Sequence, residues 1–137
     1  MASFVKFQNF VEALGKGEHQ LHAAGHTLKA YLTNNAPSVS DDSVKADLAG
    51  ITEQNGYAAA DAQNDYTEST GTGTLTCVDI TWEASGGSFG PFRYVVLYND
   101  THASDALIAY WDYGESITCE NGDTFTADFG ASVFTIA

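Results

Sequence analysis

The segment Gly90–Gly114 holds two runs of strand-forming residues around a polar stretch, and it constrains the fold more than any other part of the chain. β-Branched and aromatic residues dominate Arg93–Asn99 and Leu107–Tyr113, a composition typical of β-strands. The residues between them, Asp100–Asp105, are mostly turn formers. Arg93–Asn99 is apolar on both faces, as central strands are. We therefore expect these two runs to be neighbouring strands near the middle of a sheet.

Other runs of the chain also have the composition of strands, and turn-forming residues separate them. These runs are Thr27–Thr33, Leu75–Ala84, Ser116–Cys119, Thr124–Phe129 and Ala131–Ile136. The second of them alternates apolar and polar residues, which predicts a half-buried strand. Its apolar face would carry Val78, Ile80, Trp82 and Ala84. Asn121-Gly122 stands between the third and fourth runs and predicts a hairpin turn.

The spacing of these runs predicts a mainly β chain, because strands follow one another without the strand–helix alternation of parallel sheets. We expect an antiparallel β-sandwich, jelly-roll-like, with a short N-terminal amphipathic helix. The chain would form one domain over residues 1–137, with the helix in residues 1–15 and the β body in residues 26–137. Residues 57–73 are predicted to form a long surface loop with one edge strand, and a short helical turn is expected around Ser43–Ile51.

The N-terminal residues repeat apolar side chains at helical spacing. Ser3 could cap a helix over residues 3–14, and Gly15 could end it. The apolar side chains are Phe4, Phe7, Phe10, Val11 and Leu14. Such a face either packs on the protein's own sheet or docks on a partner, as amphipathic helices do in grooves. These five residues are therefore the candidate attachment or interface residues.

The net charge of −13 is distributed unevenly along the chain. Charges cancel over residues 1–45, whereas residues 46–137 carry Arg93 alone against fourteen carboxylates. A surface of this kind repels nucleic acid and anionic membranes, so we expect neither as a partner. The chain has no run of about 20 apolar residues, as a membrane span requires, and its start lacks the organisation of a signal peptide. We expect a protein made and used without Sec export.

Three histidines, His19, His22 and His26, are the weak candidates for a metal site. On a continuous helix they would share one face with a spacing that zinc ligands favour. Gly15, Gly17 and Gly25 interrupt this stretch, however, and a polar connection between helix and strand is the alternative. We expect no metal, no cofactor and no catalytic residues, because no nucleophile elbow or phosphate loop occurs in the chain. An enzyme that uses the histidines would have an incomplete set of ligands.

The two cysteines, Cys77 and Cys119, are expected to be reduced thiols in strands, with a disulfide as the alternative. Arg93, a lone cation among the carboxylates, is expected to form an internal or interfacial ion pair with one of them. Aromatic residues cluster around it in the sequence and could be either a stacking platform for sugars or bases, or part of the packed sheet. They are Tyr94, Tyr98, Tyr110, Trp111 and Tyr113.

Six segments of the chain form a series when they are taken in order. They are Phe4-Val-Lys-Phe-Gln-Asn-Phe-Val-Glu12, Thr27–Pro37, Ala46–Glu53 with Asn55-Gly-Tyr57, Gly87–Tyr94, Leu97–Thr101 and Ile108-Ala-Tyr-Trp-Asp-Tyr-Gly114. In that order they resemble a family of small virion structural proteins encoded by tailed bacteriophages. Together they span most of the chain. Their motifs are structural, so the resemblance implies a component of a virion more specifically than it implies which component.

The resemblance implies a capsid decoration or cement protein that binds the phage major capsid protein, as a dimer, a trimer or many copies on the particle. Its location would be the virion, after assembly in the cytoplasm of the host bacterium. The alternative is a tail or head-fibre component that binds a receptor or glycan through exposed aromatic residues such as Trp82 or Trp111. The family carries no catalytic residues that could be transferred to this chain.

Overall fold

In the computed structural model, which describes residues 2–137, the chain is mainly β, with 43% of residues in strands and 8% in helices. The largest sheet is antiparallel and has the order β1-β8-β7-β2-β3. Its strands are β1 (Ser3–Lys6), β2 (Leu28–Thr33), β3 (Ala60–Asp61), β7 (Phe89–Asn99) and β8 (Leu107–Cys119). The central position of β7 and its pairing with β8 confirm the prediction from Gly90–Gly114. No helix within the described residues is both long and apolar enough to cross a bilayer.

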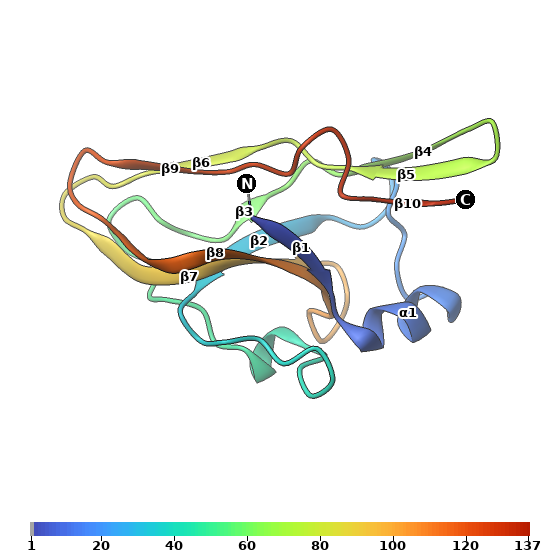
Figure 1. The fold of residues 1–137 in the computed structure, drawn as a ribbon, viewed down its shortest axis with the longest axis horizontal. Helices are drawn as coiled ribbons and strands as arrows, with labels where there is room; N and C mark the ends of the chain where they lie inside the picture. Colours follow the sequence, from blue (N-terminus) through green and yellow to red (C-terminus); the bar gives the residue numbers. More distant parts are fainter. Residues whose placement is uncertain (1) are drawn as a thin grey trace.

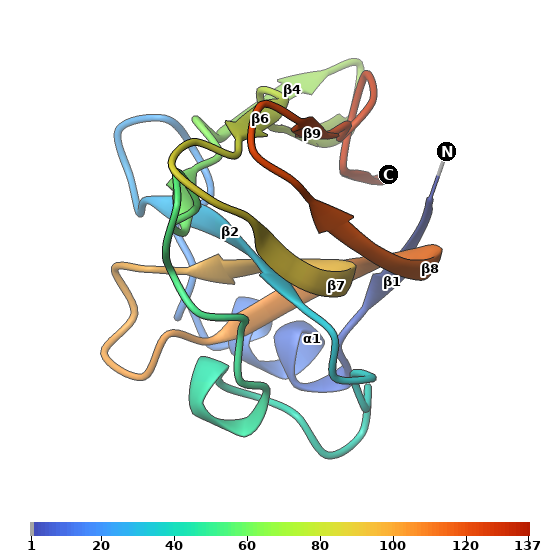
Figure 2. The ribbon, with the colours of Figure 1, turned by 90° about the vertical axis from the view of Figure 1, so that its left-hand side faces the viewer.

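A second layer of strands faces the large sheet (Figure 1, Figure 2). It consists of a three-stranded sheet in the order β10-β5-β4 and the separate pair β6-β9. These strands are β4 (Asp65–Ser69), β5 (Thr72–Thr76), β6 (Ile80–Glu83), β9 (Thr124–Ala127) and β10 (Phe134–Ile136). The main core lies between the layers and joins, among others, Leu32, Val95 and Ile108 of the large sheet to Leu75 and Trp82 of the second layer.

The opposite face of the large sheet is buried as well. A smaller apolar cluster there contains Phe7, Tyr31, Val96 and Tyr98, and Leu48 of the segment between β2 and β3 packs on it. The Tyr31 hydroxyl donates a hydrogen bond of 2.7 Å to the Leu48 carbonyl, just after the short 3-10 helix η1 (Lys45–Asp47). Burial on both faces is the physical reason that β7 is apolar from Tyr94 to Tyr98.

The N-terminal prediction was only partly right. Residues 3–6 do not begin a helix; they form β1, which pairs with β8 and places Phe4 opposite Trp111. The helix α1 covers Gln8–Gly15 and begins after Phe7, so Ser3 is not its cap. Strand pairing prevails over the helical spacing here because β8 offers a ladder of backbone partners and Phe4 and Val5 favour the strand conformation.

Two further predictions needed correction. The run Leu75–Ala84 is not one strand, because it breaks between β5 and β6, where Val78 is 52% exposed. The turn at Asn121-Gly122 forms, with Gly122 at φ +94°, but it does not close a hairpin. Instead β9 pairs with β6, opposite Ile80–Glu83. The pairing is therefore set by packing against the main core and not by the local turn.

Candidate functional site

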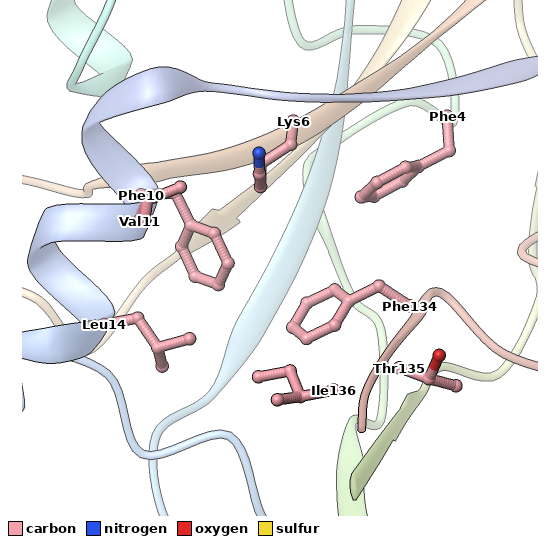
Figure 3. A pocket seen from close by; sticks show the side chains of 8 residues that line it. All are labelled: Phe4, Lys6, Phe10, Val11, Leu14, Phe134, Thr135 and Ile136. Atoms are coloured by element: carbon pink, nitrogen blue, oxygen red, sulfur yellow. The ribbon is translucent and has the colours of Figure 1, made fainter. Parts of the chain in front are cut away.

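An apolar groove of about 270 Å³ opens between α1, β1 and β10 (Figure 3). It is lined by Phe4, Lys6, Phe10, Val11, Leu14, Phe134, Thr135 and Ile136. Lys6 contributes the sole charged side chain in this lining, which contains no carboxylate. The groove is therefore an apolar, weakly cationic depression on a chain whose net charge is −13.

The spacing of these residues within α1, β1 and β10 places their side chains on the faces that line the groove. Phe4 and Lys6 are two residues apart in β1 and share a face, as do Phe134 and Ile136 in β10. Phe10 and Leu14 are four residues apart in α1 and lie on one side of the helix. The Phe134 ring touches both neighbours, with its centroid 6.4 Å from that of Phe4 and 5.7 Å from that of Phe10. Three aromatic rings thus line the depression.

Apolar side chains at the groove are unusually exposed. Three large apolar residues within residues 2–137 are exposed. Val11 (56%) and Ile136 (48%) line the groove, and Val78 lies elsewhere. Single exposed apolar side chains are common on protein surfaces, whereas an apolar depression flanked by two of them is typical of a contact site. The groove is the strongest candidate for an interaction surface on this molecule.

Four of the five predicted interface residues, Phe4, Phe10, Val11 and Leu14, line the groove. Phe7 does not join them, because it is fully buried in the cluster on the other face of the large sheet. Sequence reasoning missed the contribution of β10. The run Ala131–Ile136 was recognisable as a strand, but no local signal indicates that Phe134 and Ile136 face α1, because that contact joins opposite ends of the chain.

A second hollow of about 350 Å³ extends the groove past the C-terminal end of α1, toward the loop that follows the helix. The two depressions share Leu14 and Ile136, and the second also includes His19 and His22. The surface available to a partner is therefore elongated. It begins at Phe4 and ends near the loop that follows α1.

The predicted histidines take part in a different arrangement, which centres on Asn99 at the end of β7. The Asn99 side-chain carbonyl accepts hydrogen bonds from the backbone N–H groups of Thr101 (3.0 Å) and His102 (3.2 Å). Its amide nitrogen lies 3.0 Å from Nδ1 of His19 and 2.9 Å from Nδ1 of His26. The carbonyl contacts fix the orientation of the amide, so its two N–H groups donate to the two imidazoles. We call this arrangement the Asn99 clamp.

The clamp requires neutral imidazoles at both positions, because a protonated Nδ1 could not accept from Asn99. His19 is 6% exposed, and its Nε2 is buried without a hydrogen-bond partner among residues 2–137. Burial lowers the pKa of His19 to about 4, with help from the nearby His102 and His26 and against the opposing charge of Glu18. The clamp therefore fastens the loop after α1 to the loop between β7 and β8.

The three candidate metal ligands do not form a metal site. The stretch that carries them is irregular and not helical, and His22 is exposed while His19 and His26 bind Asn99. Within residues 2–137 no three histidine, cysteine or acidic side chains converge as metal ligands would.

Comparison of the chain with protein-family models, with curated proteins and with solved structures finds no match.

Arg93 forms the ion pair that its isolation in the sequence predicted. Its Nε lies 2.8 Å from Oδ1 of Asp112 and its Nη2 lies 3.1 Å from Oδ2, across the β7–β8 pair. Hydrogen bonding to Arg93 lowers the pKa of Asp112 below its ordinary value. The two-bond geometry is specific, although both side chains are partly exposed.

Arg93→Met is expected to lower the Tm by a few degrees, because it removes a bidentate pair between the central strands. The matched control is Lys16→Met, which removes the exposed pair between Lys16 and Glu12 of α1 and should change the Tm less. Differential scanning calorimetry of both variants measures the difference. Equal melting of Arg93→Met and wild type would show that the pair contributes nothing to stability.

The aromatic residues of β7 and β8 belong to the packed structure and not to an exposed platform. Trp111 is 5% exposed, and Trp82 is 4% exposed with its Nε1–H donating 2.8 Å to the Ala58 carbonyl. Tyr94 and Tyr98 are buried too, and Tyr110 and Tyr113 are half-buried. Neither tryptophan therefore offers the exposed ring that glycan binding through Trp82 or Trp111 would need. Both cysteines are free, and burial raises the pKa of Cys77 to about 12.

Proposed function

We propose that this protein is a capsid decoration or cement protein of a tailed bacteriophage, and that it attaches to the major capsid protein through the groove between α1, β1 and β10. The observation that carries the proposal is the apolar groove with exposed Val11 and Ile136 on an otherwise acidic molecule. An acidic body remains soluble, while an apolar patch gives the contact. Many copies on a lattice would gain avidity from modest single contacts.

Two structural features are proposed along with this function. The antiparallel layers would constitute a β-sandwich of jelly-roll type, which is supported by the main core that both layers share. The protein would act as a homo-oligomer or as many copies on the virion, without binding nucleic acid or membrane. The acidity of residues 46–137 supports that exclusion, because contacts to phosphate groups require lysine and arginine.

Deleting the N-terminal region would be a poor test of attachment. Residues 3–6 pair with β8, and Phe7 and Phe10 are buried in the two apolar clusters. Loss of these residues would destabilise the whole fold along with any contact surface. Substitutions at exposed groove positions leave the core intact and separate the two effects.

The double variant Val11→Glu/Ile136→Glu is expected to reduce attachment to the parent phage particle by about a hundredfold or more, because it places two carboxylates at an apolar contact. Stripped particles are incubated with purified protein, and bound protein is measured by co-sedimentation. Cryo-electron microscopy of the wild-type mixture then gives the position and number of bound copies.

Val78→Glu is the matched control, since Val78 is exposed to a similar degree but lies outside the groove. It should bind as wild type does, and both variants should keep the wild-type Tm within a few degrees. Failure of wild-type protein to bind the particle would contradict the proposed function. Equal binding by the double variant and by Val78→Glu would contradict attachment through the groove.

A further inference from the structure

We propose that the groove binds an extended segment of a partner chain, which adds to the free edge of β1 as a further strand, places alternate apolar side chains in the groove and presents a carboxylate to Lys6. This inference rests on the proposed function only for the identity of the partner. The mode of binding follows from the edge of β1, the shape of the groove and its charge.

The outer edge of β1 is available for strand addition. Among residues 2–137, β1 is the end strand of the large sheet, with β8 as its one strand neighbour. The Phe7 N–H donates a hydrogen bond of 3.1 Å to the Ile108 carbonyl. This bond shows which residues of β1 direct their backbone groups toward β8, because these residues alternate in an antiparallel ladder. The backbone N–H and C=O groups of Val5 therefore point toward β8, as those of Phe7 do, because alternate residues of a strand face the same edge. The backbone groups of Phe4 and Lys6 point away from β8, toward the free edge. The same two residues place their side chains in the groove (Figure 3).

The second layer also ends beside the groove. β10 is the end strand of its sheet, and its Phe134 ring contacts the rings of Phe4 and Phe10. An incoming strand along β1 would therefore cover an apolar surface that Phe134 and Ile136 supply from the other layer. Strand addition of this type takes its affinity from backbone hydrogen bonds and its specificity from pockets for alternate side chains.

The shape of the surface favours an extended occupant. The groove of about 270 Å³ and the hollow of about 350 Å³ share Leu14 and Ile136, so together they form a long, shallow depression. The first is slightly smaller than the ~300–1,000 Å³ pockets that enclose drug-sized ligands. A strand fits such a depression because every second side chain points to the same face, so apolar side chains can enter the depression along its length.

The charge of the groove selects the chemistry of that strand. Lys6 forms no salt bridge with any carboxylate among residues 2–137, and no acidic side chain lines the groove. A lysine on an edge strand disfavours purely apolar neighbours, whereas an acidic residue in the incoming strand would pair with it. A second copy of this chain that docked groove to groove is disfavoured as the occupant, because a twofold contact would bring the two Lys6 side chains together and supply no carboxylate for either.

The test uses a displayed library of random linear peptides of about ten residues, the upper range of strand lengths, selected on the wild-type protein. We expect enriched peptides to carry apolar residues at every second position together with an Asp or Glu. Enrichment of apolar residues at helical spacing, or no enrichment, would overturn the proposal. Sedimentation equilibrium of the wild type and the Val11→Glu variant tests whether a second copy of the chain occupies the groove. A wild-type dimer that this substitution disrupts would also overturn the proposal.

Substitutions at Lys6 then separate strand addition from side-chain contact. Lys6→Gln removes the charge and should weaken binding of a selected peptide a few-fold. Lys6→Pro also removes the outward N–H without breaking the pairing of β1 with β8, and it should weaken binding about tenfold further. Equal affinities of these two variants would contradict backbone pairing.

Amide hydrogen exchange of the wild-type protein tests strand addition independently of Lys6→Pro, in case that variant does not fold. In wild-type protein saturated with the selected peptide, the amide protons of Phe4 and Lys6 should exchange more slowly than in free protein, by about tenfold or more. Unchanged exchange at both amides would overturn the proposal. The proposed function is tested separately, because a protein that binds peptides in this way but never binds the particle keeps the inference and loses the function.

Discussion

Asn99→Ala is expected to lower the free energy of unfolding by about 3 kcal/mol, because one buried side chain makes four hydrogen bonds. Three of the four groups would lose their partner, whereas Nδ1 of His26 would keep the Gln20 N–H at 3.2 Å. Asn99 is fully buried. Its carbonyl serves the backbone N–H groups of Thr101 and His102, and its N–H groups serve Nδ1 of His19 and His26. Urea denaturation followed by circular dichroism at pH 7 measures the loss.

The control for this substitution is Asn34→Ala. Asn34 is exposed, and its side chain accepts one hydrogen bond, from the Ser116 hydroxyl. Its removal should change the free energy of unfolding by no more than about 0.5 kcal/mol. If Asn99→Ala were as mild as Asn34→Ala, the clamp would not hold the two loops together.

The clamp also gives the protein a defined response to acid. Burial lowers the pKa of His19 from 6.5 in the unfolded chain to about 4 in the fold. The unfolded state therefore takes up a proton first as the pH falls. The stability that depends on neutral His19 is complete above pH 6.5, and a loss of about 3 kcal/mol accumulates as the pH falls to about 4.

Asn99→Asp should reduce that loss, because a carboxylate facing the two imidazoles favours their protonated forms. The measurement is the difference in unfolding free energy between pH 7 and pH 5, compared with that of Asn34→Asp, which adds the same charge at an exposed position. Equal acid dependence in Asn99→Asp and Asn34→Asp would mean that Asn99 does not control the protonation of the histidines.

Much of the central sheet was predictable from the sequence because its signals are local. The strand composition of Gly90–Gly114 indicated β7 and β8, and apolar residues on both faces of β7 indicated burial on both sides. The isolation of Arg93 indicated its ion pair with a carboxylate, and the pairing of β7 with β8 explains why that carboxylate is Asp112.

The candidate site was predictable only in part because it is made by contacts across the whole chain. The helical spacing of the N-terminal apolar residues is real, but pairing with β8 converts residues 3–6 into a strand and sends Phe7 to the opposite face. β10 joins the groove from the other end of the chain. The spacing of the three histidines suggested metal ligands, whereas His19 and His26 bind Asn99, which follows His19 by 80 positions, and His22 is exposed.

Phe10→Ala is expected to cost about 3–5 kcal/mol in unfolding free energy, since it removes a large buried side chain and leaves a cavity. Phe10 is 2% exposed, and its ring packs at a tilt against His19, with 5.1 Å between ring centroids, and edge-to-face against Phe134. It therefore anchors α1 to both the clamp and β10. Thermal denaturation should show a large fall in Tm, and the groove should lose its affinity for the particle at temperatures where the fold persists.

Val11→Ala provides the comparison on the same helix. Val11 is 56% exposed, and alanine has the higher helix propensity, so this change should alter the unfolding free energy by no more than about 0.5 kcal/mol. Particle binding should fall in Val11→Ala without a change in Tm, whereas in Phe10→Ala both should fall together. A stable Phe10→Ala variant would mean that Phe10 does not anchor α1 and that the floor of the groove is not part of the core.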